Sequence, residues 1–181
     1  LGHRLRRRSP SRGWRVVTEA ALGMRAPEPA AAEALFNRVL PADHLSVRRA
    51  LTDLHARLSP HVSADVMGRL ELVLAEVMNN IVRHGADAAR RDGPVRPRRI
   101  HLSAACHRNG VACAVTDDGI GLPPACLVAP PSPAHPAGEP LPEGGFGWLI
   151  IHGLTRSLVY FREDTRNLLA FNIPAMDEAE G

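Results

Sequence analysis

The sequence predicts a single domain of the α/β class, and three observations support this. The length of 181 residues suits one domain with a sizeable buried core. Residues 44–58 and 63–85 repeat apolar side chains at helical spacing. Short apolar stretches bounded by turn residues, which are typical of strands, occupy 33–43 and 100–117 and recur in 157–173.

The first half of the chain is expected to form one strand and two helices. "EALFNRVLPAD" predicts a strand that ends in a turn at Pro41. A helix over 44–58 follows, and Pro60 stops it. The second helix has Ser63 as its N-cap and Gly85 as its C-cap.

The second half is expected to add two hairpins, a long loop and a short helix. "IHLSAACHRNGVACAVTDDG" predicts two strands joined at Asn109-Gly110, a register that sets Cys106 opposite Cys113. Residues 122–143 hold eight of the 16 prolines and form a loop that is either functional or disordered. A short helix follows the turn "GGFG", and "REDT" joins the two closing strands.

Composition and charge describe a globular chain with a basic N-terminal end. Hydrophobic residues make up 45% of it, and no apolar run approaches the roughly 20 residues of a membrane span. The net charge is +3, but residues 1–25 hold seven arginines and one acid, so the rest is mildly acidic. We interpret 1–25 as a disordered extension or as sequence upstream of a start at Met24; contact with nucleic acid is the alternative. The domain then spans 26–176, and 177–181 form a tail.

The cysteines and histidines do not predict a metal centre. The three cysteines are an odd number without the spacing of metal ligands, which predicts free thiols in a reducing cytoplasm. The nine histidines are scattered, and no pair has the spacing of a known ligand motif.

One face of the second helix carries polar side chains suited to chemistry. In "ELVLAEVMNNIVRHG", Glu76, Asn80 and then Arg83 or His84 follow one another three or four residues apart. A carboxylate, an amide and a cation therefore line one side of the helix. The same pattern also fits an ordinary solvated face.

Two glycine-containing turns complete the candidate motifs. In "AVTDDGIG", Asp117 ends a buried row of the strand, and a buried acid needs a hydrogen-bond donor, although an ordinary Asp-Gly turn has the same sequence. In "GGFGWLIIHGL", three glycines open an apolar helix, where successive N–H groups can bind an anion. A P-loop would add a lysine. This chain contains none, because its 22 basic residues are all arginine.

Taken in order, these three motifs resemble the N, G1 and G2 boxes of the GHKL ATPases, the superfamily of gyrase, histidine kinases and MutL. They are Glu-x-x-x-Asn at 76–80, Asp-x-Gly-x-Gly at 117–121 and Gly-Gly-x-Gly at 144–147. Within this superfamily, residues 34–174 resemble the stand-alone RsbW-type anti-sigma serine kinases. The resemblance implies an α/β two-layer sandwich in which helices cover one face of a mixed β-sheet, the Bergerat fold.

The resemblance also implies ATP and Mg²⁺ as cofactors and a role for each box. Asp117 would accept a hydrogen bond from the adenine amino group, and Asn80 would supply an oxygen to Mg²⁺. Glu76 would be the catalytic base that orients a serine hydroxyl or a water, and Arg83 would contact a phosphate in place of the missing lysine. The remaining nucleotide-binding positions would be Gly119, Gly121, Gly144, Gly145, Phe146 and Gly147.

Three departures from the superfamily pattern bear on turnover more than on binding. The loop 122–143, which would form the ATP lid, contains neither arginine nor lysine. Phe146 fills the variable position of the G2 box. Asn167 takes the place of a threonine that often braces the adenine-binding acid.

The implied function is that of a cytoplasmic switch protein. It would bind ATP, sequester a sigma factor, and phosphorylate an anti-anti-sigma (STAS-type) protein on serine. Homodimers are common among such relatives, and we expect no direct binding to DNA or membranes. The alternatives are an ATP-binding anti-sigma or regulatory module with little kinase activity, the catalytic half of a split histidine kinase, and a fold that has lost its nucleotide.

Overall fold

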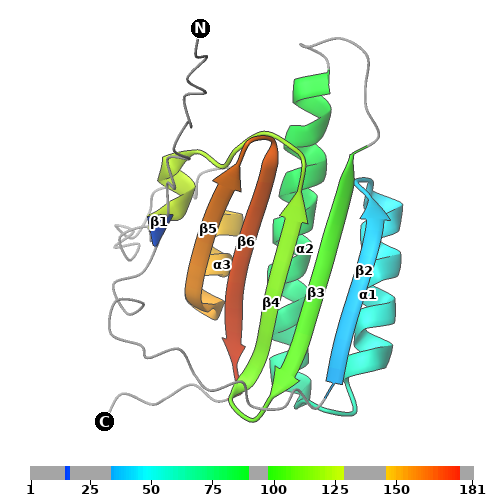
Figure 1. Ribbon diagram of the computed structural model, residues 1–181. Helices are drawn as coiled ribbons and strands as arrows, with labels where there is room; N and C mark the ends of the chain where they lie inside the picture. The colour runs from blue at the N-terminus through cyan, green and yellow to red at the C-terminus, as the bar shows by residue number, and fades with distance from the viewer. Residues whose placement is uncertain (1–14, 17–33, 90–97, 129–145, 176–181) are drawn as a thin grey trace, which may run out of the picture.

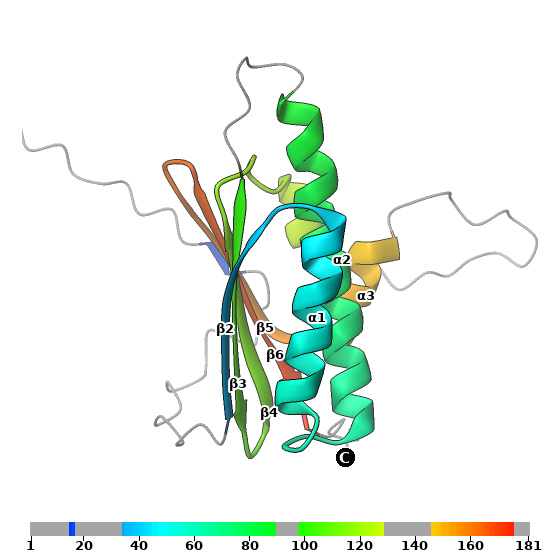
Figure 2. The same cartoon turned by 90° about the vertical axis from the view of Figure 1, so that its right-hand side faces the viewer.

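The computed structural model describes residues 15–16, 34–89, 98–128 and 146–175, and for 15–16, 34 and 85–89 it describes only the backbone. These residues form two layers, a six-stranded sheet and a layer of helices that covers one of its faces (Figure 1, Figure 2). The predicted two-layer α/β sandwich is confirmed. Most of the predicted N-terminal extension, much of the predicted lid and the C-terminal tail lie outside the described residues.

The sheet differs from the predicted mixed sheet, because every pairing between its described strands is antiparallel. The strand order is β1-β5-β6-β4-β3-β2. β4 and β5 run in the same direction, but β6 lies between them and pairs with both (Figure 1). The strands are β1 Arg15–Val16, β2 Ala34–Pro41, β3 Arg99–His107, β4 Gly110–Asp117, β5 Arg156–Glu163 and β6 Arg166–Pro174.

Two long helices form most of the second layer. α1 (His44–Leu58) begins after Asp43, whose carboxylate accepts a hydrogen bond from a first-turn N–H. α2 (Ala64–Ala89) begins after the predicted cap Ser63, whose hydroxyl accepts from a first-turn N–H. Gly85 does not end α2 as predicted, since a glycine inside a helix costs only about 1 kcal/mol. The shorter helices are η2 (a 3-10 helix), Pro124–Leu127, and α3, Phe146–Leu154.

The predicted hairpin between β3 and β4 is confirmed, but its register is shifted by two residues, which keeps each side chain on its predicted face. His107 pairs with Gly110, so Cys106 lies opposite Val111 and not opposite Cys113. Gly110 has a φ of 130°, which glycine tolerates and which lets it pair directly beside the turn. Both cysteines still face the core, and neither forms a disulfide.

The core between the two layers ends where the functional motifs begin. Alternate residues of β3 and β4 face the apolar stripe of α2, and Leu74, Ile100 and Val111 are fully buried there. The buried row of β4 continues through Val115 to Asp117, which is the last residue of the strand. The packing of the core thus sets the position of the Asp117 carboxylate. Among the described residues, no helix is both long and apolar enough to cross a membrane.

Candidate functional site

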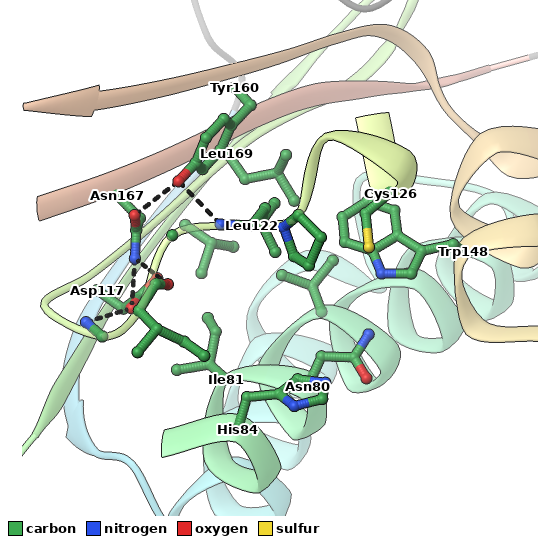
Figure 3. Close-up of a pocket in the computed structure, with 16 residues that line it drawn as sticks. Asn80, Ile81, His84, Asp117, Leu122, Cys126, Trp148, Tyr160, Asn167 and Leu169 are labelled. Atoms are coloured by element: carbon green, nitrogen blue, oxygen red, sulfur yellow. Dashed lines mark hydrogen bonds between the residues drawn. The ribbon is translucent and has the colours of Figure 1, made fainter. Parts of the chain in front are cut away.

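A cavity opens between the sheet and the helices, where the ends of β4 and β6 approach α2 and α3 (Figure 3). The cavity together with its open mouth encloses about 740 Å³, part of which is open to solvent. Most of its wall is apolar, which suits a flat ring system. The wall includes Ile81, Val115, Leu122, Trp148, Tyr160 and Leu169.

Asp117 presents a carboxylate to this cavity from the end of β4. Its Oδ1 accepts hydrogen bonds from the backbone N–H of Gly119 at 2.6 Å and from Nδ2 of Asn167 at 3.0 Å. Within the described parts of the chain, no group donates a hydrogen bond to Oδ2. Oδ2 is therefore left to accept a hydrogen bond from a ligand.

Burial raises the pKa of the Asp117 carboxyl above its ordinary value of 3.8. The hydrogen bonds from Asn167 and Gly119 act in the opposite direction, as does the positive charge of Arg162, whereas Asp118 adds to the rise. The hydrogen bonds favour the ionised form because an ionised carboxylate only accepts. The donors around Asp117 thus work to keep it an acceptor, against the effect of burial.

Asn167 is buried beside Asp117 and uses its whole hydrogen-bonding capacity (Figure 3). Nδ2 donates to Oδ1 of Asp117 and to the backbone oxygen of Ile120 at 2.9 Å. Oδ1 accepts from the Tyr160 hydroxyl at 2.7 Å and from Nη1 of Arg162 at 2.5 Å. In the superfamily pattern Asn167 is a departure that bears on turnover. In the structure, however, its side chain donates a hydrogen bond to Asp117 and so braces the acid directly.

Gly119 and Gly121 have little room for a side chain. A Cβ on Gly119 would lie 2.6 Å from Oδ1 of Asp117, and a Cβ on Gly121 would lie 3.1 Å from the side chain of Arg162. The two glycines therefore let the loop fold back onto the acid that it follows. Their predicted close approach to a nucleotide base stays a prediction.

α2 supplies the opposite wall and the second predicted motif. Asn80 and His84 line the cavity, on a different wall from Asp117 (Figure 3). Oε2 of Glu76 lies only 2.5 Å from where a Cβ on Gly147 would stand, and Nδ2 of Asn80 lies 3.7 Å from the same point. The start of α3 therefore rests on the face of α2 that carries the predicted base and the predicted metal ligand.

The structure does not bring every predicted residue to the cavity. Arg83 is exposed on α2, and Phe146 is 37% exposed at the start of α3; neither lines the cavity. Gly144 and Gly145 lie outside the described residues. The predicted contacts of these four residues with the nucleotide therefore remain predictions.

Sequence reasoning missed Trp148, Tyr160 and Arg162. Trp148 lines the cavity from α3, within the glycine motif whose apolar residues were interpreted only as a helix. Tyr160 is the single tyrosine of the chain and occupies a buried strand position. A buried tyrosine needs a partner for its hydroxyl, so the strand pattern around it contained a usable signal.

One wall of the cavity carries the loop with Asp117 and its two glycines, and the face of α2 with Glu76 and Asn80 lies beside the other wall. This combination is typical of an α/β nucleotide-binding domain. The chain belongs to a particular family of such domains, because a profile of the histidine kinase-like ATPase domain matches residues 38–173, well over half of its length. A search of curated proteins finds no significant match. The family match confirms the resemblance to the GHKL superfamily, whereas the RsbW-type assignment stays a prediction.

The described residues fit ATP and Mg²⁺, which membership of this family implies. The apolar cavity with one free carboxylate oxygen, on Asp117, suits an adenine with its amino group. Among the described residues, no cluster of three or more histidine, cysteine, aspartate or glutamate side chains could hold a metal ion. Mg²⁺ commonly binds through one or two protein ligands together with substrate phosphates. A single oxygen from Asn80 is therefore a sufficient contribution from the protein to the ligands of Mg²⁺.

We expect the preference for ATP over inosine triphosphate (ITP) to fall as the pH is lowered through the raised pKa of Asp117. An ionised Asp117 carboxylate would accept a hydrogen bond from the 6-amino group of adenine, whereas a protonated carboxyl would donate one to the 6-oxo group of hypoxanthine. Charge changes on the phosphates or elsewhere in the cavity affect both nucleotides and cancel in the ratio of affinities. Calorimetric titrations at several pH values measure this ratio, and a ratio constant down to acid unfolding would contradict the expectation.

Lowering the pH should weaken the preference for ATP, but it should increase the contribution of Asp117 to the stability of the nucleotide-free protein. Because the folded-state pKa of Asp117 is raised above 3.8, the folded state binds this proton more tightly than the unfolded state. The contribution of Asp117 to stability therefore improves as the pH falls through the raised pKa towards 3.8. Urea unfolding of wild type and Asp117→Asn at matched pH values isolates this contribution.

Proposed function

We propose that this protein is an ATP-binding anti-sigma factor and serine kinase. It sequesters a sigma factor and phosphorylates an anti-anti-sigma protein of the STAS type, and it acts in the cytoplasm, where both partners work. The observation that carries the kinase assignment is the position of Glu76. Its carboxylate lies against Gly147 and next to Asn80, beside the cavity and not in the adenine-facing wall.

The proposed division of labour follows from these positions. Asp117 binds and orients the base, while the Glu76 carboxylate accepts the proton of a serine hydroxyl and aims that hydroxyl along the line of attack. Asn80 contributes a side-chain oxygen to Mg²⁺. When bound, Mg²⁺ would offset the negative charge that phosphoryl transfer places on the phosphate oxygens.

Two alternative functions are also compatible with the described residues. An ATP-binding anti-sigma module with little kinase activity is favoured by the exposed position of Arg83 and by the absence of arginine and lysine from the sequence of residues 122–143. A pure binding module, however, has little use for a carboxylate placed beside Asn80. The catalytic half of a split histidine kinase would use the same pocket and differ only in the acceptor.

The test is a transfer assay with γ-labelled ATP, Mg²⁺, the purified chain and candidate STAS-domain proteins. The proposal expects label on the STAS protein that survives acid, as phosphoserine does. Acid-labile label would indicate a histidine acceptor. Tight ATP binding without any transfer would indicate the binding module.

Gly147→Ala should slow phosphoryl transfer about 10- to 100-fold, which is the typical effect of a misplaced catalytic group. The new methyl group would stand 2.5 Å from Oε2 of Glu76, so the carboxylate must move away. Gly153→Ala is a matched control in the same helix, because a Cβ there meets no atom within 4 Å. Both variants remove a helical glycine and should stabilise α3 alike. Equal transfer rates for the two variants would contradict the proposed role of Glu76.

A further inference from the structure

Two side chains of β5, Tyr160 and Arg162, meet the amide of Asn167, and none of the three belongs to the recognised motifs. The Tyr160 hydroxyl and Arg162 Nη1 both donate to Asn167 Oδ1. Arg162 can only donate hydrogen bonds. On the other side of the amide, the backbone oxygen of Ile120 can only accept, and it receives a hydrogen bond from Nδ2. The orientation of the amide is therefore fixed by the chemistry of its neighbours.

This orientation determines what Asp117 encounters. With Oδ1 of Asn167 held by two donors, Nδ2 must face Asp117 and donates to its Oδ1 at 3.0 Å. Together with the Gly119 N–H, Asn167 gives Oδ1 of Asp117 two donors and no acceptor. A reversed amide would place its oxygen against the carboxylate and its NH₂ against the donors of β5. Such an arrangement leaves several buried groups unpaired.

The same residues also hold the loop that follows Asp117. Arg162 Nη1 donates to the backbone oxygen of Gly119 at 3.1 Å, and the Tyr160 hydroxyl accepts from the Leu122 N–H at 3.1 Å. The Tyr160 hydroxyl thus donates its one proton to Asn167 and accepts from the loop. Side chains of β5 and β6 consequently fix both the acid and the backbone that surrounds it.

We propose that Tyr160 and Arg162 are positioning residues for base selection, which orient Asn167 so that Asp117 remains an acceptor-only carboxylate and the site selects a 6-amino purine over a 6-oxo purine. This inference rests on the proposed binding of ATP and extends it to the choice of base. A 6-amino group donates to Oδ2 of Asp117. A 6-oxo group would oppose it with lone pairs and leave both unpaired.

The test compares ATP and ITP affinities, measured by calorimetry, in variants of the full chain. Asn167→Asp keeps the shape of the side chain but removes both N–H donors, so we expect the ATP-to-ITP affinity ratio to fall roughly tenfold or more. Asn172→Asp is the matched control on the same strand. Asn172 bonds His107 at 3.0 Å and does not line the cavity, so its variant should keep the wild-type ratio.

Tyr160→Phe and Arg162→Met test the orienting role while leaving Asn167 intact. Each removes one donor to Oδ1, and the methionine keeps an aliphatic stem beside Gly121. One remaining donor still orients the amide, so each single variant should change the ratio only about two- to threefold, and the double variant should lose more than the product of both. This non-additivity distinguishes orientation of the amide from independent contributions to folding.

The outcomes separate this inference from the proposed function. Variants that lower the melting temperature but keep the wild-type ATP-to-ITP ratio would overturn the inference while leaving ATP binding intact. A wild-type protein that binds ATP and ITP equally would do the same. A wild-type protein that binds neither nucleotide would overturn the proposed function together with the inference.

Discussion

Replacing Asp117 with asparagine should weaken ATP binding by roughly 10- to 100-fold, the cost of leaving buried hydrogen-bonding groups unpaired. The orientation of the new amide is predictable. The position of Oδ1 faces two donors, the Gly119 N–H and Asn167 Nδ2, so the amide oxygen must take that place. The NH₂ group is then left at the position of Oδ2, where it meets the adenine amino group as a second donor.

The same variant should gain relative affinity for ITP. An NH₂ group at the position of Oδ2 can donate to the 6-oxo group of hypoxanthine. The expected result is therefore not a general loss of binding but a reversal of base preference. Equal weakening for both nucleotides would show that Asp117 supports the fold of the pocket and does not read the base.

Trp148 provides a convenient measurement of this change. It lines the cavity, and the chain has only two tryptophans, so Trp14→Phe leaves Trp148 as the only tryptophan whose fluorescence can report binding. Asp118→Asn is the matched control, since it makes the same change in charge at the next residue. Asp118 is exposed, and from the described part of the chain it accepts only a 3.4 Å hydrogen bond, from the Arg99 N–H. The Asp118→Asn variant should bind ATP and ITP with wild-type affinities.

Much of the fold was predictable because local signals coincide with tertiary packing. The Asp43–Leu58 segment combines a capping acid with an apolar stripe, and Ser63 precedes a second stripe. The predictions for the end of α2 and for the register of the β3–β4 hairpin were wrong. Each prediction depended on a glycine, Gly85 or Gly110, and the tendency of a single glycine to end a helix or to occupy a turn is weak.

The sheet order was beyond local reasoning, because β6 inserts between strands that are distant in the sequence. This order also creates the site. Arg162, Asn167 and Asp117 are direct cross-strand partners in one row over β5, β6 and β4. The sequence predicts that the two closing strands form a hairpin with Arg162 in the turn "REDT", which brings Arg162 near Asn167 but does not give their register. The contact of Asn167 with Asp117 joins residues 50 apart in the sequence and required the fold.

Glu76→Gln should reduce phosphoryl transfer by about 10²- to 10⁴-fold, the usual contribution of a general base. Glutamine keeps the length of the side chain and its contact with Gly147, but it cannot take a proton from a serine hydroxyl. ATP affinity should not fall. It should stay level or rise slightly, because the change removes a negative charge near the place where the phosphates would lie.

Glu71→Gln on the same helix controls for the loss of a negative charge. Glu71 forms a 2.9 Å hydrogen bond with His55 of α1, on the opposite side of α2 from the cavity wall. The Glu71→Gln variant should therefore transfer phosphate at the wild-type rate. A split in which Glu76→Gln keeps affinity and loses transfer identifies a base. If it loses both, Glu76 is structural, and the contact with Gly147 is simply packing. If it loses neither, the serine proton leaves by another route, and the kinase mechanism proposed for this pocket is wrong.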